Sequence, residues 1–290
     1  MWKVTCVLWI SLLGSTVPAL QAQSLQETRD LGFQALERAR YAQAEAYLKR
    51  VAFFQQDSPQ ARVQESLGRC YLALGKPETA FAYFDRAFFL YRGEAQAQAR
   101  TMLGKARSLL QKGAFQEALL ELYTAPTPPE ATQQRQLQFY LGLTHYLTQE
   151  YETAYDEWQP LVRPDSLSQA RFYRLLHDEK TLQRPRPKTA RNLSYVLPGL
   201  GQFYAGDFKN GFNSLLLNGT LVTLSVRVAM RYSFLDAILA VIPWFQRYYL
   251  GGATKAQTVA RKQRAENRRE TLETVLGLFT NPPAGPATTP

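Results

Sequence analysis

The pattern of apolar and polar residues divides the chain into two regions. In residues 23–182, apolar side chains recur at the three- and four-residue spacing of amphipathic helices, and Pro59 and Pro126 fall between the helical segments. Beyond residue 193, longer apolar runs alternate with short polar turns. The pattern therefore predicts an all-α protein in which a helical solenoid is followed by a hydrophobic helical hairpin.

One sequence unit recurs in the first region. Its clearest copy contains Leu67-Gly68, Tyr71 and Phe84. The copies align on one alanine, which gives Ala44, Ala80, Ala118 and Ala154. The unit resembles the tetratricopeptide repeat, in which a small residue lies where the two helices of a hairpin meet. This resemblance implies about four stacked helical hairpins and a capping helix within residues 23–182, with one continuous core.

Five arginines are expected on the concave face that the first helix of each repeat lines: Arg29, Arg62, Arg69, Arg100 and Arg107. Arginine binds carboxylates through two parallel hydrogen bonds. The five residues therefore indicate a groove for an acidic or C-terminal peptide segment of a protein partner. Alternatively, they pair with acidic residues of neighbouring helices, Glu37, Glu65 and Glu94, in a solvated face of little energetic value.

Residues 1–22 have the pattern of a secretory signal peptide. Lys3 precedes an apolar run at residues 4–13, and small residues at Ala19 and Ala22 suit cleavage. An uncleaved anchor is the alternative interpretation. Cleavage would leave Cys70 as the one remaining cysteine of two, so no intramolecular disulfide could form. A single cysteine on a helix is typical of a small buried hydrophobic residue.

The positive charge is confined to the second region. The formal net charge is +10, yet residues 23–182 contain 19 Lys plus Arg and 19 Asp plus Glu. Residues 183–290 contain 14 basic and 5 acidic residues. Because the basic residues accompany the apolar runs, they favour anionic membrane lipids as partners and argue against nucleic acid.

A group of small and polar residues introduces the hydrophobic region, after a stiff basic linker at residues 183–192. This motif consists of Pro198, Gly199, Gly201, Gln202, Tyr204 and Gly206. It is similar to the motif of a bacterial two-transmembrane hairpin domain family that recurs behind tetratricopeptide repeats. Gly251-Gly252 and Lys255 are similar to the family's usual ending. The resemblance implies a membrane hairpin at residues 193–252 and supplies no reaction.

Residues 253–280 are expected to form a basic amphipathic helix, either on a membrane surface or in solvent. Residues 281–290 are rich in Pro, Thr and Ala and are expected to be disordered. Two topology signals conflict. The signal peptide places the repeats outside the cytoplasm, whereas the basic flanks of the hairpin favour the cytoplasmic side. We favour the signal peptide, because export is decided at the first segment.

No motif for catalysis, phosphate binding or metal binding is present, and neither His145 nor His177 has ligand spacing from a cysteine. We therefore predict no enzymatic activity, no cofactor and no metal. The predicted function is that of a membrane-anchored scaffold in the bacterial envelope, with periplasmic repeats that bind a protein partner. The alternative is an accessory subunit of a membrane transport or envelope-biogenesis complex, engaged through the hairpin.

Overall fold

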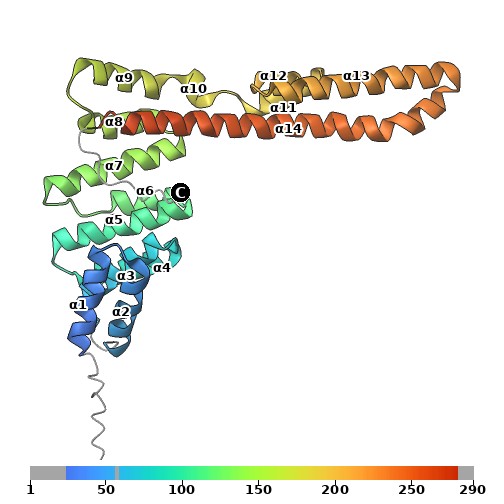
Figure 1. Cartoon of the computed structure of the whole chain (residues 1–290). Coiled ribbons are helices and arrows are strands. Elements are labelled where there is room, and N and C mark those ends of the chain that lie inside the picture. Colours follow the sequence, from blue (N-terminus) through green and yellow to red (C-terminus); the bar gives the residue numbers. More distant parts are fainter. Residues whose placement is uncertain (1–23, 56–58, 280–290) are drawn as a thin grey trace, which may run out of the picture. The chain divides into compact units, whose positions relative to one another are not determined.

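The computed structural model describes residues 24–55 and 59–279, nearly all of them in helices and short turns (Figure 1). The predicted signal peptide and the predicted disordered tail lie outside the described residues. The chain forms two compact units. The N-terminal unit comprises Met1–Ala114 with Ala125–Thr127, and the C-terminal unit comprises Phe115–Thr124 with Pro128–Pro290.

The N-terminal unit is built from helical hairpins. Helices α1 (Leu25–Glu37) and α2 (Tyr41–Phe54) form one hairpin, and α3 (Ala61–Ala73) and α4 (Pro77–Leu90) form the next. Helix α5 (Ala95–Lys112) packs against α4. The first helices are neighbours, because α1 contacts α3 and α3 contacts α5. The all-α fold and the hairpin repeat that the sequence predicts are therefore present.

Small residues set the packing of these hairpins. Ala44 and Ala80 are fully buried. A Cβ at Gly68 would lie 2.9 Å from Cδ1 of Phe84, so only glycine lets α3 approach α4 this closely. Gly32 meets Leu48 of α2 in the same way. The aligned alanines and glycines thus occupy the helix crossings, as the repeat pattern predicts.

The C-terminal unit continues the helical pairing and then extends into a long antiparallel hairpin of two helices, α13 and α14 (Figure 1). Ala118 and Ala154 are fully buried, and a Cβ at Gly142 would overlap Trp158. The elements are α6 (Phe115–Tyr123), α7 (Ala131–Thr148), α8 (Tyr151–Trp158), η1 (Gln159–Leu161), α9 (Ser166–His177), α10 (Glu179–Gln183), α11 (Pro187–Val196), α12 (Leu200–Tyr204), α13 (Phe208–Arg231) and α14 (Phe234–Leu276).

Two elements differ from the sequence expectation. Part of the expected stiff linker is helical, because Pro187 begins α11 at a position where a missing N–H group is tolerated. Helix α14 runs without interruption from Phe234 to Leu276, through Pro243 and through the expected boundary at residues 252 and 253. The second helix of the hairpin and the expected amphipathic helix are therefore one continuous helix, α14.

The end of α14 packs on protein, where the sequence analysis expected a membrane surface or solvent. Phe279 forms a β-bridge with Val162, and its ring lies 5.5 Å from that of Trp158. The hydroxyl of Tyr146 donates a hydrogen bond of 2.8 Å to the Arg268 carbonyl. Phe279 is buried against Phe139 of α7 and Trp158 of α8. These helices belong to the C-terminal unit, which therefore begins well before the expected boundary at residue 182.

Candidate functional site

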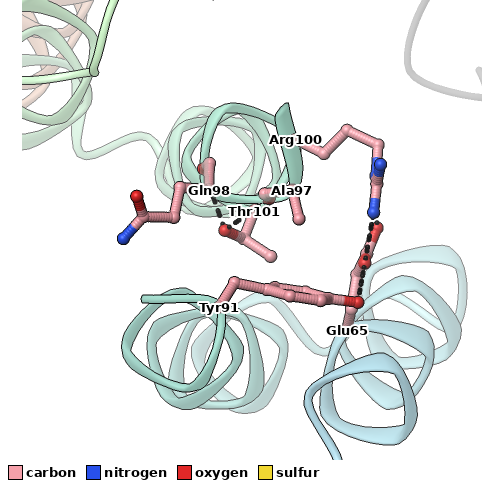
Figure 2. Close-up of polar contacts among 6 residues, drawn as sticks. All are labelled: Glu65, Tyr91, Ala97, Gln98, Arg100 and Thr101. Carbon is pink, nitrogen blue, oxygen red and sulfur yellow. Dashed lines mark hydrogen bonds and ion pairs between the residues drawn. The ribbon is translucent and has the colours of Figure 1, made fainter. Parts of the chain in front are cut away.

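The polar contacts between the first helices of the N-terminal unit centre on Glu65 of α3 (Figure 2). Arg100 of α5 donates two hydrogen bonds to its carboxylate, Nε to Oε1 at 3.0 Å and Nη2 to Oε2 at 3.2 Å. The hydroxyl of Tyr91 donates a third, 2.8 Å from Oε2. Such paired donors are the strong form of arginine–carboxylate contact. Arg100 is therefore already occupied by an acid of the protein, as the alternative interpretation proposed.

The ionisation of this cluster reflects its contacts. The hydrogen bond to Glu65 raises the pKa of Arg100. Burial, followed by the hydrogen bond to Glu65, raises the pKa of Tyr91 well above its usual value of 10.0. Arg100 therefore remains charged and Tyr91 remains protonated at physiological pH. The cluster clamps α3 to α5 and offers an incoming ligand little unpaired charge.

Arg29 and Arg62 line the same face between α1 and α3. The Arg29 Nε lies 3.5 Å from Oδ1 of Asp30, and its Nη1 donates a long hydrogen bond of 3.4 Å to Gln60. The Arg62 guanidinium lies over the Phe33 ring, 4.4 Å from the ring centroid. This cation–π contact orients Arg62 but leaves it without a carboxylate among the described residues.

Arg69 and Arg107 complete the set of five. Arg69 is exposed on α3, and within the part of the chain that the structure describes it has no hydrogen bond or ion pair. Arg107 is half-buried on α5, and its Nε lacks a hydrogen-bond partner there. The structure thus places all five arginines on the first helices and gives Arg29 and Arg100 acidic partners. Arg62, Arg69 and Arg107 remain available to a ligand.

The motif residues of the second region meet at one junction of α11, α12, α13 and α14. Gln202 of α12 is 1% exposed and lies at the centre. Its Nε2 donates a hydrogen bond of 2.9 Å to the Gly252 carbonyl of α14, and its Oε1 accepts one of 3.2 Å from Ser194 of α11. One buried amide therefore ties three helices together.

Glycines permit the close approach of the backbone at this junction. A Cβ at Gly201 would overlap the Ala190 carbonyl oxygen of α11. Gly199 has φ 98° and begins α12, and a Cβ there would overlap the Gly211 carbonyl oxygen of α13. Both positions exclude every other side chain unless the helices move apart.

The remaining motif residues frame the same turn. The Tyr204 hydroxyl accepts a hydrogen bond of 3.1 Å from the Arg186 amide. Gly206 has φ 84° in the turn before α13, and Pro198 precedes the left-handed Gly199. The motif is thus a structural junction, and its side chains are directed at neighbouring helices.

The two ends of residues 193–252 lie together. Lys255 of α14 donates a hydrogen bond of 2.8 Å to Oδ1 of Asn210 on α13. The Tyr249 hydroxyl donates to the Tyr195 carbonyl of α11. Together with the bond between Gln202 and Gly252, these contacts fix the base of the α13–α14 hairpin.

Beyond this base, the α13–α14 hairpin exposes many large apolar side chains. Within residues 24–55 and 59–279, no helix combines the length and the apolar content that crossing a bilayer requires. The apolar side chains that are more than half exposed include Phe208, Phe212, Leu216, Val222, Val226, Met230, Tyr232, Phe234, Leu235, Leu239 and Trp244. We call this surface the apolar hairpin face. Exposed apolar side chains that gather on a protein surface are typical of interaction sites.

Reactive chemistry has little support in the described residues. Cys70 is fully buried, as expected of a small hydrophobic residue, and burial raises the pKa of its thiol to about 11. A thiol held protonated in this way is a poor nucleophile. Among the residues that the structure describes, no group of three or more His, Cys, Asp and Glu side chains is placed to hold a metal ion.

No protein-family model and no curated protein sequence matches the chain. Among solved structures, the chain is similar to a TPR repeats protein from Bacteroides fragilis, with 15% sequence identity. The alignment covers 87% of this chain and 99% of that chain, with a TM-score of 0.35. Similarity at this level carries no information about ligands.

Sequence reasoning missed two parts of these sites. Ser194 orients Gln202 only because α11 is helical, and the prolines at 185 and 187 argue against a helix there. Tyr91 reaches Glu65 because it closes α4. Neither contact has a signal in local sequence, because each depends on how two helices pack.

Proposed function

We propose that the chain is a non-enzymatic scaffold held at a membrane of the bacterial cell envelope, and that its repeats bind a protein partner. The apolar hairpin face carries the proposal. Exposed cations accompany that face, including Lys209, Arg227, Arg247 and Lys255. Burial of apolar side chains and attraction of cations to anionic headgroups reinforce each other at a lipid surface.

Vesicle flotation tests the membrane part. We expect the purified chain to float with vesicles that contain phosphatidylcholine and phosphatidylglycerol, and to float less with phosphatidylcholine alone. The double variant Phe212→Asp and Leu216→Asp should remain at the bottom of the gradient, because it places two charges on the apolar hairpin face. Flotation of that variant at the level of the unchanged chain would contradict lipid binding through this face.

A matched control separates charge from position. Phe53→Asp with Phe89→Asp introduces the same charge at two aromatic side chains that are as exposed as Leu216 but lie in the N-terminal unit. This control should float normally.

The binding part rests on Arg62 and Arg69. The two residues are seven positions apart on α3, which places them on one face about 10 Å from each other. Both are exposed and neither has a carboxylate partner among the described residues. This spacing suits two carboxylates of an acidic peptide, or one acidic side chain and a C-terminal carboxylate.

Crosslinking in cells, followed by identification of partners, tests this part. Arg62→Glu with Arg69→Glu should abolish crosslinks to the partner. Arg50→Glu with Arg92→Glu changes the charge equally at exposed residues of α2 and of the end of α4, and should retain the crosslinks. Loss of crosslinks in both pairs, or in neither, would overturn the groove on α3.

The second candidate is an accessory subunit of a membrane transport or envelope-biogenesis complex. The apolar hairpin face also favours this function, because a membrane protein could cover it. In that case, Phe212→Asp with Leu216→Asp should abolish co-purification with a membrane protein in detergent, whereas Arg62→Glu with Arg69→Glu should leave it intact. The scaffold function predicts the reverse: Arg62→Glu with Arg69→Glu should abolish co-purification, and Phe212→Asp with Leu216→Asp should leave it intact.

Placement of the repeats outside the cytoplasm is part of the proposal and rests on the signal-peptide pattern. Alkaline phosphatase fused to the C-terminus should be active in cells, because the hairpin returns both of its ends to one side. If the alkaline phosphatase fusion is inactive and a green fluorescent protein fused to the same end is fluorescent, the repeats lie in the cytoplasm instead.

A further inference from the structure

A second surface of the N-terminal unit is hollowed. A cavity of about 600 Å³ lies between α2 and α4, on the second helices of the first two hairpins. Its volume falls within the range of sites that bind small ligands or peptide side chains. Residues that line it include Lys49, Phe53, Gln64, Tyr83, Arg86 and Phe89. None of these belongs to the five arginines of the first helices.

The walls of the cavity are aromatic and open to solvent. Phe53 is 66% exposed and Phe89 is 68% exposed. Tyr83 is held in place by stacking on Tyr71, with ring centroids 5.2 Å apart. Aromatic rings left in water on both sides of a hollow can bury substantial apolar area when a ligand side chain enters between them.

The floor of the cavity has an unsatisfied polar group. Gln64 of α3 is 6% exposed, and its Oε1 has no hydrogen-bond partner within the described residues. A buried carbonyl oxygen without a donor is unfavourable, because it has lost its hydrogen bonds to water. A ligand that donates a hydrogen bond here would remove that penalty, so the floor favours a group with an N–H or O–H.

The rim of the cavity is positive. Arg86 lies 5.7 Å from the Tyr83 ring centroid and has no carboxylate partner among the described residues. Lys49 is loosely paired with Glu45, at 3.5 Å, and remains half exposed. The rim therefore complements a carboxylate beside the apolar group.

We propose that this cavity binds a short peptide segment of a partner protein in which an aromatic or large aliphatic side chain is flanked by carboxylates. The apolar side chain enters between Phe53 and Phe89, a peptide N–H donates to Oε1 of Gln64, and a carboxylate pairs with Arg86. The site is lined mainly by α2 and α4 and takes only Gln64 from α3, so it shares no residue with the groove proposed above.

Calorimetric titration of the full chain with defined peptides tests the site. The probe is acetyl-Gly-Asp-Glu-Phe-Leu-Asp-Gly-amide. In one matched peptide, Asn and Gln replace the acidic residues. In the other, Ser-Ser replaces Phe-Leu. We expect the probe to bind and each matched peptide to bind at least tenfold more weakly. Absence of binding by the probe, or equal binding of all three peptides, would overturn the proposal.

Three variants locate the binding. Arg86→Glu should weaken binding of the probe peptide at least tenfold. Gln64→Leu should weaken it several-fold while leaving the melting temperature unchanged or raised, because it removes an unsatisfied buried oxygen. Lys112→Glu, at an exposed residue at the end of α5, should bind normally. Binding that survives Arg86→Glu and Gln64→Leu, or that is lost in Lys112→Glu, would place the peptide elsewhere and overturn the proposal.

Discussion

The helical hairpins of the repeats and the junction around Gln202 hold helices together by different means. At the crossing of α3 and α4, Gly68 receives the Phe84 ring, and the contact is entirely apolar. At the junction, Gly201 receives a backbone carbonyl, and one buried amide bonds to both α11 and α14. The junction adds directional bonds to a small apolar cluster of Ala190, Ala205, Ala256 and Ala260, whereas the contact of Gly68 with Phe84 depends on apolar packing alone.

The difference also concerns what each region leaves exposed. The repeats bury their apolar residues in a core around Leu67 and Phe84. The α13–α14 hairpin exposes its apolar residues, and the polar junction fixes its base. A directional junction can orient two helices whose large apolar side chains remain exposed. Five experiments test this comparison.

The largest effect is expected at the junction. Gly201→Ala should destabilise the C-terminal unit by about 4 kcal/mol or more, because a Cβ overlaps the Ala190 carbonyl and backbone must move. Urea unfolding followed by tryptophan fluorescence checks this, since Trp158 and Trp244 both lie in this unit. Gly251→Ala is the control. Its Cβ meets no atom within 4 Å, so it should stabilise the helix by about 0.5–1 kcal/mol. Equal stability of the two variants would refute the close contact.

The core of the repeats should respond next. Phe84→Ala is expected to lower the free energy of unfolding of the N-terminal unit by about 3–4 kcal/mol, because it leaves a cavity against Gly68 and Gly104. Phe89→Ala, on the same helix but 68% exposed, should change stability by less than about 0.5 kcal/mol. Urea unfolding monitored by circular dichroism measures both. A small effect of Phe84→Ala would mean that this ring is not part of the core.

Removal of the central amide should have an intermediate effect. Gln202→Leu leaves the Gly252 carbonyl and the Ser194 hydroxyl without their partner and should destabilise the C-terminal unit by about 2–3 kcal/mol. Gln246→Leu, at an exposed position of α14, serves as the control and should be close to neutral. If both variants unfold at the same urea concentration, the polar junction contributes nothing to stability.

The buried thiol of Cys70 predicts a pH dependence. Burial raises its pKa from 9.0 to about 11, so the unfolded chain releases this proton at a lower pH than the folded chain does. Stability should therefore fall as the pH rises from 9 towards 11, by at most about 1.4 kcal/mol per pH unit from this group. Cys70→Ala should show a shallower fall between pH 9 and 10. Identical slopes for the two proteins would show that the thiol ionises equally in both states.

The smallest effect is expected between α3 and α5. A double-mutant cycle of Glu65→Ala and Arg100→Ala should give a coupling free energy of about 0.5–1 kcal/mol, because Arg100 is partly exposed to solvent. The coupling should decrease in high salt. A coupling of zero at low salt would mean that the two side chains are not paired in solution.

Sequence reasoning predicted the helical hairpins because their signal is local and repeated. The aligned alanines at 44, 80, 118 and 154 are all fully buried, as the repeat pattern predicts. The grouping of the motif residues followed from a resemblance, and the structure shows the contacts that join them. The five arginines lie on the first helices, as predicted, yet the sequence does not show that Arg100 is already paired with Glu65.

Other features depend on tertiary packing that no local pattern specifies. Pro243 and Gly251-Gly252 are typical helix-ending residues, yet α14 continues through them because α11 and α13 pack along its length. The burial of Phe279 requires Trp158, more than a hundred residues earlier. The cavity above Gln64 exists only once α2, α3 and α4 have come together.

Hydrogen–deuterium exchange of the full chain, with and without anionic vesicles, shows which part of the molecule contacts lipid. We expect slower exchange in the outer parts of α13 and α14 when vesicles are present, and unchanged exchange in α1 to α5. Protection confined to the repeats, or no protection in α13 and α14, would contradict the assignment of lipid contact to the apolar hairpin face.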